Sequence, residues 1–361
     1  MADDLIKQTL TFSQEGLPVP PPKKNLAKIV IAIVIVVFLG TGVSLATQIW
    51  DPLWNPFRPS PETVIEKMTE KMGAVQTIHS NIDFETSIKN ETAFDFKINT
   101  QADTDSTNPD NLKDERDFNL SFNVAGMQTS LGFKQKTIGQ SSYIKLTTVP
   151  AQVLGPVLQG LGIDINQLRN TWIKIDEDSL KNFLGPEFSQ KIEEEQEKSK
   201  EKQVMMVEKL KKLVENKKLY LVKEELSDAK VGEIKTYHYI VALNKEEIKS
   251  IVPELLKIFG EEEGAQSLAG ENLQKLQGEI DNFFEKIGEL SGEVWIGKRD
   301  KFLYRLSGDK NFDISQFAKG KKGAVIVKLN IDFSNFNQPI VIEPPPEFKS
   351  IEEIFKLPTS K

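Results

Sequence analysis

Apolar and polar side chains alternate with a period of two along much of the chain from residue 78 to residue 333. This period is typical of strands that bury one face and leave the other in water. The pattern predicts an α+β fold with an antiparallel sheet of about eleven strands. They are expected near residues 78–88, 94–98, 118–124, 127–133, 138–146, 172–175, 219–226, 233–243, 292–297, 302–306 and 324–333.

Helical patterns occur before the first strand and in two insertions. Ser60-Pro61-Glu62 has the order of an N-cap, a first-turn proline and an acidic first turn, so a helix is expected to begin there. Asn244 to Glu247 has capping-box spacing. The helical insertions are expected near 179–217 and 244–288, an exposed loop at 103–111, and a lid or pair of short helices at 150–168.

The N-terminal part predicts a membrane anchor. Ile29–Ile49 contains no charged residue, and as a helix this stretch of 21 residues spans roughly 31 Å, about the thickness of the hydrocarbon core. Three lysines precede it, which favours a cytoplasmic N-terminus and an extracytoplasmic remainder. We therefore expect a cytoplasmic tail at 1–25, a signal-anchor helix at 26–49, a Pro/Trp-rich stalk at 50–60, a domain at 61–346, and a tail or short edge helix at 347–361. The alternative is a cleaved signal peptide, since Ser44-Leu45-Ala46 resembles a cleavage site.

The composition of the chain argues against several classes of function. The formal net charge of -7 argues against a nucleic-acid partner, which requires clustered cations. The chain has no cysteine, which rules out thiol chemistry and a lipid-modified cysteine. The two histidines lie far apart in the sequence and form neither a metal-binding nor a Ser/His/Asp pattern, and the acidic loop at 103–111 lacks the glycine and final glutamate of a calcium loop. We therefore expect no enzymatic activity, no cofactor and no metal site.

Phenylalanine recurs on the apolar side of the first strands. An antiparallel sheet that buries one face must cover it with helices, a partner or an apolar ligand. If a ligand covers it, the expected cavity-lining residues are Phe84, Phe96, Phe118, Phe122 and Phe133. The alternative is an ordinary core closed by the helical regions.

Several segments resemble the LolA/LppX group of bacterial lipid-carrier lipoproteins. They are 60–85, Tyr143–Leu146, Thr171–Ile175, Lys235–Ile248, Gly292–Leu306 and Ile331–Pro345. The resemblance implies a curved half-barrel with helices on its concave side and a cavity for lipid or another hydrophobic ligand.

Two features depart from that group. This chain has an apparent transmembrane helix in place of a lipid anchor, and a charged helical insertion near 191–218. A tethered protein would extract, present or sense lipid close to its own membrane. The other interpretation is a cell-surface structural or interaction module that has a filled core and docks to an envelope protein.

Overall fold

The computed structural model describes residues 53, 55–89, 94–108, 111–124, 126–150, 155, 165–176, 179, 205, 209, 212–213, 217–260, 278, 281–282, 284–316 and 322–355. The chain divides into two compact units, Met1–Arg58 and Pro59–Lys361. The expected tail at 1–25 and signal-anchor helix at 26–49 lie outside the described residues, as does most of the insertion at 179–217. Within the described part, no helix is both long and apolar enough to cross a membrane.

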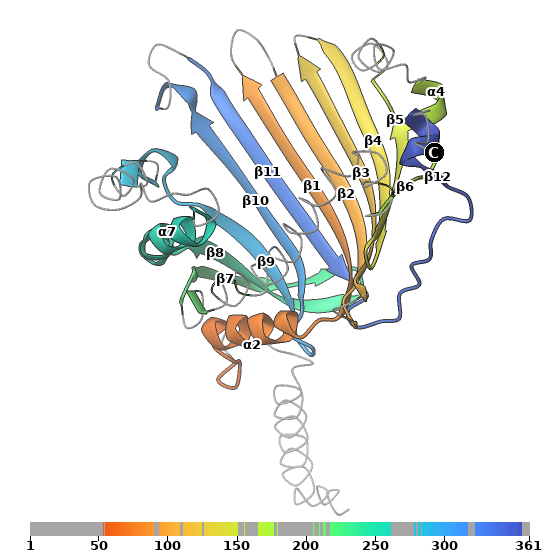
Figure 1. The fold of residues 1–361 in the computed structure, drawn as a ribbon. Helices are drawn as coiled ribbons and strands as arrows, with labels where there is room; N and C mark the ends of the chain where they lie inside the picture. Colours follow the sequence, from red (N-terminus) through yellow and green to blue (C-terminus); the bar gives the residue numbers. More distant parts are fainter. Residues whose placement is uncertain are drawn as a thin grey trace, which may run out of the picture. The chain divides into compact units, whose positions relative to one another are not determined.

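One sheet of twelve strands forms the unit Pro59–Lys361, in the order β12-β6-β5-β4-β3-β2-β1-β11-β10-β9-β8-β7. All neighbours pair antiparallel except β12 and β6. The sheet curls across its width into an open half-barrel (Figure 1). The strands are β1 (Thr77–Lys89), β2 (Phe94–Asp105), β3 (Lys113–Val124), β4 (Met127–Ile138), β5 (Ser141–Thr148), β6 (Ile173–Ile175), β7 (Tyr220–Val231), β8 (Ile234–Leu243), β9 (Ser291–Gly297), β10 (Leu303–Asp313), β11 (Ala324–Ser334) and β12 (Lys349–Ser350).

The predicted antiparallel sheet is thus confirmed, with two corrections. The expected loop at 103–111 begins later, because Asp103–Asp105 continue β2 and pair with Lys113–Glu115 of β3. The side chains of these residues are polar on both faces of the strand, so the sequence shows no alternation of apolar and polar positions there. The second correction is β12, a two-residue strand whose partner is β6.

Within the part of the chain that the structure describes, the helical elements with defined bounds are α2 (Pro61–Gly73), α4 (Ile165–Leu168), α7 (Lys245–Gly260), the 3-10 turn η2 (Ile314–Gln316) and α9 (Ile351–Phe355). Ser60 caps α2 by accepting a hydrogen bond from the Thr63 backbone N–H, as its sequence predicts. Asn244 likewise accepts from the Glu247 N–H at the start of α7. The expected edge helix in the C-terminal segment is α9, whose Ile354 packs against Leu168 of α4.

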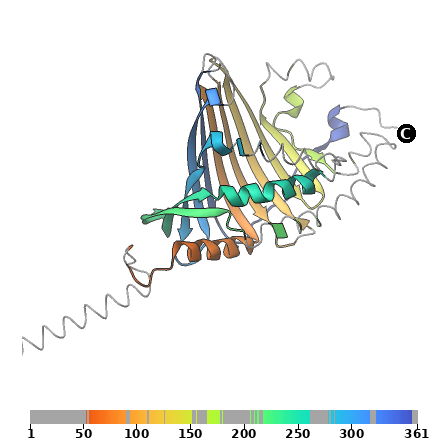
Figure 2. The same cartoon turned by 90° about the vertical axis from the view of Figure 1, so that its left-hand side faces the viewer.

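The main hydrophobic core lies between α2 and the strands β8 and β9 (Figure 2). Val64 of α2 is fully buried against Tyr237, Tyr239 and Ile296, and all three of these side chains are also fully buried. The apolar face of α2 therefore fixes this helix on one part of the sheet.

The segment after β11 crosses one end of the sheet. The Asn337 N–H donates to the Thr77 carbonyl at the start of β1, and the Lys349 N–H donates to the Trp172 carbonyl beside β6. Between these points Lys136 Nζ, at the end of β4, donates to the Glu343 carbonyl. Hydrogen bonds near both ends of the crossing segment (335–348) and one near its middle therefore hold it to β1, β4 and the residue before β6.

Truncating Val64 to alanine should lower the free energy of unfolding of Pro59–Lys361 by about 2 kcal/mol, because it leaves a cavity in a fully buried cluster. Urea unfolding followed by circular dichroism measures the change. Glu66→Ala on the exposed side of α2 is the control, with an expected change below about 0.5 kcal/mol. A loss for Val64→Ala no larger than that of the control would show that α2 does not anchor the sheet.

An ion pair between Lys174 of β6 and Asp176, just after this strand, should make the stability of the fold depend on pH. Hydrogen bonds from Lys174 and Ser179 lower the pKa of Asp176 to about 2. The ionised carboxylate therefore stabilises the fold above the unfolded pKa of about 3.9, and this contribution is lost as the pH falls toward 2.

Asp176→Asn should cost about 2 kcal/mol of unfolding free energy at neutral pH, and the difference from the wild type should narrow as the pH falls below about 4. Urea titrations between neutral pH and the lowest pH at which the protein is folded measure it. Asp95→Asn, at an exposed position of β2, is the matched control. A difference that stays constant with pH would contradict the assignment.

Candidate functional site

The pairing registers place all five predicted phenylalanines on one side of the sheet. Phe96 lies directly opposite Phe122, and Phe118 lies opposite Phe133. Phe84 of β1 is aligned with Ile98 of β2 and with Leu329 of β11. We call this side the apolar face; it also carries Ile82, Leu120, Leu131, Leu306, Val327 and Ile331.

The aromatic rings on this face contact one another in two groups. Phe84 meets Phe96 edge-on with 6.3 Å between ring centroids, and Phe96 stacks on Phe122 at 6.0 Å. Phe118 and Phe133 stack at 4.8 Å. All five side chains are only half-buried, whereas the residues under α2 on the same face are fully buried. The face therefore has a closed part on β8 and β9 and a less covered part on β1 to β4.

A pocket of about 230 Å³ lies on the apolar face next to the phenylalanines. Gly308 of β10 lines this pocket and is opposite Leu329 of β11, which in turn is aligned with Phe84 of β1. The pocket is smaller than the several hundred Å³ expected of a complete ligand cavity. Its apolar lining is Val241, Leu243, Leu290, Leu306, Phe312, Val327 and Leu329.

The predicted lid at 150–168 lies largely outside the described residues. Its last part is α4, where Leu168 is buried against Ile354 and packs on Leu146 and Ile173. Arg169 forms a bridge to Leu146 just after α4. This end of the segment is therefore fixed to the β5–β6 side of the sheet, and a movable lid stays a prediction for 151–164.

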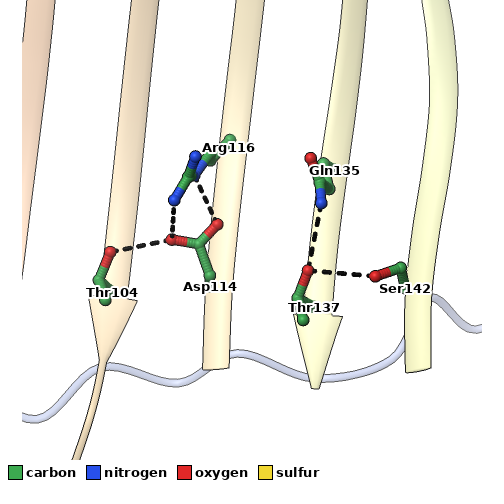
Figure 3. Close-up of polar contacts among 6 residues, drawn as sticks. All are labelled: Thr104, Asp114, Arg116, Gln135, Thr137 and Ser142. Atoms are coloured by element: carbon green, nitrogen blue, oxygen red, sulfur yellow. Dashed lines mark hydrogen bonds and ion pairs between the residues drawn. The ribbon is translucent and has the colours of Figure 1, made fainter. Parts of the chain in front are cut away.

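The apolar face changes to polar at the end of the sheet near the crossing segment. We call the six side chains there the polar row: Thr104, Asp114, Arg116, Gln135, Thr137 and Ser142 (Figure 3). Asp114 is 5% exposed, and its carboxylate accepts hydrogen bonds from Thr104 Oγ1 at 2.9 Å and from Arg116 Nη2 at 3.3 Å. It also forms an ion pair with Arg116, whose Nε lies 2.7 Å from Asp114 Oδ2. Gln135 Nε2 donates to Thr137 Oγ1 at 3.3 Å, and the Thr137 and Ser142 hydroxyls are 3.4 Å apart.

The polar row is a feature that the sequence interpretation missed. A usable signal was present, because Asp114 and Arg116 have the same strand parity as Phe118 and Phe122. Period two therefore extends the apolar face into polar positions once β3 is known to begin at Lys113.

Both histidines make a hydrogen bond to a carboxylate. His79 Nδ1 lies 2.8 Å from Asp103 Oδ1, and His238 Nε2 lies 2.7 Å from Glu293 Oε2. His238 also stacks on Trp295, with 4.3 Å between ring centroids. Within the described ranges, no three His, Asp or Glu side chains come together to hold a metal.

Comparison with known proteins finds matches among solved structures. No family model matches the chain, and neither does any curated protein sequence. Among solved structures it is similar to LprF from Mycobacterium bovis, with 14% identity over 80% of this chain and 98% of that one, at a TM-score of 0.34.

Two further solved structures also match the chain. The lipoprotein LppX of Mycobacterium tuberculosis has 12% identity over 79% of this chain and 100% of that one, with a TM-score of 0.32. A LolA-superfamily protein of Nitrosomonas europaea has 7% identity over 79% of this chain and 96% of that one, with a TM-score of 0.18. The comparison thus returns the LolA/LppX group that the sequence resembles, and at these TM-scores it says nothing of a ligand.

Proposed function

We propose that this chain binds lipid or another hydrophobic ligand on the apolar face, without catalysing a reaction. The observation that supports this most strongly is the uneven burial of that face. Its β8–β9 part is sealed by α2, whereas five phenylalanines on β1 to β4 are only half-buried. Apolar area removed from water stabilises a complex by roughly 25 cal/mol per Å².

The pocket beside Phe84 supports the same proposal. It is apolar on nearly all sides and adjoins the half-buried rings through Leu329. An acyl chain lying across the phenylalanines with one end in this pocket would cover both. The ligand would then be held by shape and burial, because the face offers few polar groups away from the polar row.

The membrane anchor is the second element of the proposal. The uncharged segment within 26–49 would tether the domain outside the cytoplasm, with the chain entering α2 through the Pro-rich stretch at 50–60. A domain held in this way would extract, present or sense a lipid at its own membrane.

The competing proposal is an interaction module whose apolar face is simply core. The exposed edge strand β7 carries Tyr220 and Leu221 at its start, which are 51% and 41% exposed. The remainder of β7 has the charged residues Lys223, Glu224, Glu225, Asp228 and Lys230, which discourage pairing with a further strand. This edge therefore favours the ligand proposal over a strand-pairing partner.

Phe122→Asp tests the ligand proposal. Pro59–Lys361 is produced in a bacterial host and purified without detergent, and its lipids are extracted and quantified by mass spectrometry. We expect the wild type to carry one lipid per chain and Phe122→Asp to carry at least about tenfold less, because a carboxylate would face the acyl chain.

Ser121→Asp is the matched control, since it adds the same charge to the same strand on the opposite face. It should retain the lipid. If Phe122→Asp unfolds while Ser121→Asp folds, Phe122 is plain core and the interaction module is favoured. Equal lipid content in a folded Phe122→Asp would also overturn the proposed site.

A further inference from the structure

Three successive pairs of residues on β3 and β4 pass from apolar to polar along one face. Phe118 lies opposite Phe133, then Arg116 opposite Gln135, then Asp114 opposite Thr137. Side chains two residues apart on a strand share a face, and directly opposed residues have Cβ atoms about 5 Å apart. The polar row therefore begins immediately beside the stacked Phe118–Phe133 pair, without an intervening layer.

Asp114 holds the Arg116 side chain in place. The Asp114 carboxylate lies 2.7 Å from Arg116 Nε in an ion pair and accepts a hydrogen bond from Nη2 at 3.3 Å. The Thr104 hydroxyl is a third donor to this carboxylate. Asp114 is 5% exposed, but the Arg116 side chain is 54% exposed. A guanidinium has five N–H donors, and the bonds to Asp114 engage two of them. The rest of this group is available to an acceptor on a ligand.

Gln135 provides the complementary group opposite Arg116. Its Nε2 donates to Thr137, so the amide oxygen is directed away from that bond, as Figure 3 shows. The hydroxyls of Thr137 and Ser142 continue the row toward β6. Donors and acceptors therefore stand side by side at one end of an apolar surface, which is the arrangement that an ester and its neighbouring hydroxyls would match.

Charge narrows the ligand class. The row contains one carboxylate and one guanidinium, which are paired with each other, so its formal charge is zero. An anionic head group would be attracted by Arg116 but repelled by the adjacent Asp114. A cationic head group would be attracted by Asp114 but repelled by Arg116. Lys136, which binds the Glu343 carbonyl of the crossing segment, lies on the opposite face of β4 from Gln135 and Thr137 and so adds no charge to the row.

We propose that the polar row binds the uncharged, hydrogen-bonding head group of an amphiphile, such as the glycerol ester of a monoacylglycerol. The acyl chain then runs from Phe118 and Phe133 along the apolar face. This inference rests on the proposed function and adds the class and orientation of the ligand. The head group lies at the end of the sheet where α2 leads into β1 (Figure 1).

Photo-crosslinking of the full chain in phosphatidylcholine nanodiscs tests the inference. One probe is oleoylglycerol with a diazirine next to the ester, and the other is a hydrocarbon of equal chain length with a diazirine at one end. Gln135→Met keeps the length of the side chain but removes its amide. We expect it to lower labelling of β3 and β4 by the glycerol probe about fivefold, as for the loss of one or two hydrogen bonds, and to leave hydrocarbon labelling unchanged.

Gln101→Met is the matched control, since Gln101 is an exposed residue on the opposite face of β2. It should leave both probes unaffected. Comparing variants with one probe at a time cancels differences in how the probes partition into the bilayer.

The outcomes separate the two proposals. If both probes label the apolar face but Gln135→Met changes neither, the head-group site is wrong and the hydrophobic site stands. If neither probe labels the apolar face, both proposals fail. If an oleate probe labels β3 and β4 more strongly than oleoylglycerol, with the same dependence on Gln135, the uncharged class is wrong.

Discussion

One open sheet with a single apolar face is the constraint on which the rest of this structure depends. Twelve strands pair side by side without closing into a barrel, so the apolar face must be covered by something other than another sheet. The chain covers the β8–β9 part with α2, whose Val64 contacts the buried tyrosines there. On β1 to β4 the same face carries half-buried phenylalanines, and a hydrophobic ligand is the occupant that we propose for it.

The two ends of the apolar face differ in chemistry. Around Gly308 and Leu329 it contains an apolar pocket, while at the crossing segment it ends in the polar row built on the buried Asp114. A buried carboxylate is costly unless it is hydrogen-bonded, and Thr104 and Arg116 meet that requirement. The same bonds hold the Arg116 guanidinium beside Phe118. The contacts that compensate the buried Asp114 carboxylate thus also place polar groups where the head group of an amphiphile would lie.

The sequence predicts the sheet well because a strand with one buried face has apolar side chains at every second position. On this basis the sequence predicts that the five phenylalanines share one face, and the pairs Phe96–Phe122 and Phe118–Phe133 confirm this shared face. Where both sides of a strand are polar, as at Asp103–Asp105, no apolar period remains, and the sequence therefore predicts a loop in place of the strand. The Asp114–Arg116 bond was equally hidden, because register decides which polar side chains meet. Gly308 and Leu329 both line the pocket, and only the pairing of β10 with β11 reveals that they lie opposite each other.

The central claim is that the apolar face holds a hydrophobic ligand. It is tested most directly by crystals of Pro59–Lys361 grown with a lipid whose acyl chain carries bromine. Anomalous scattering then locates the chain without reference to side-chain positions. The account predicts bromine peaks on the apolar face, between the ring of Phe84 and the pocket at Leu329. Peaks confined to the opposite face, or no peaks and a face closed by its own side chains, would contradict it.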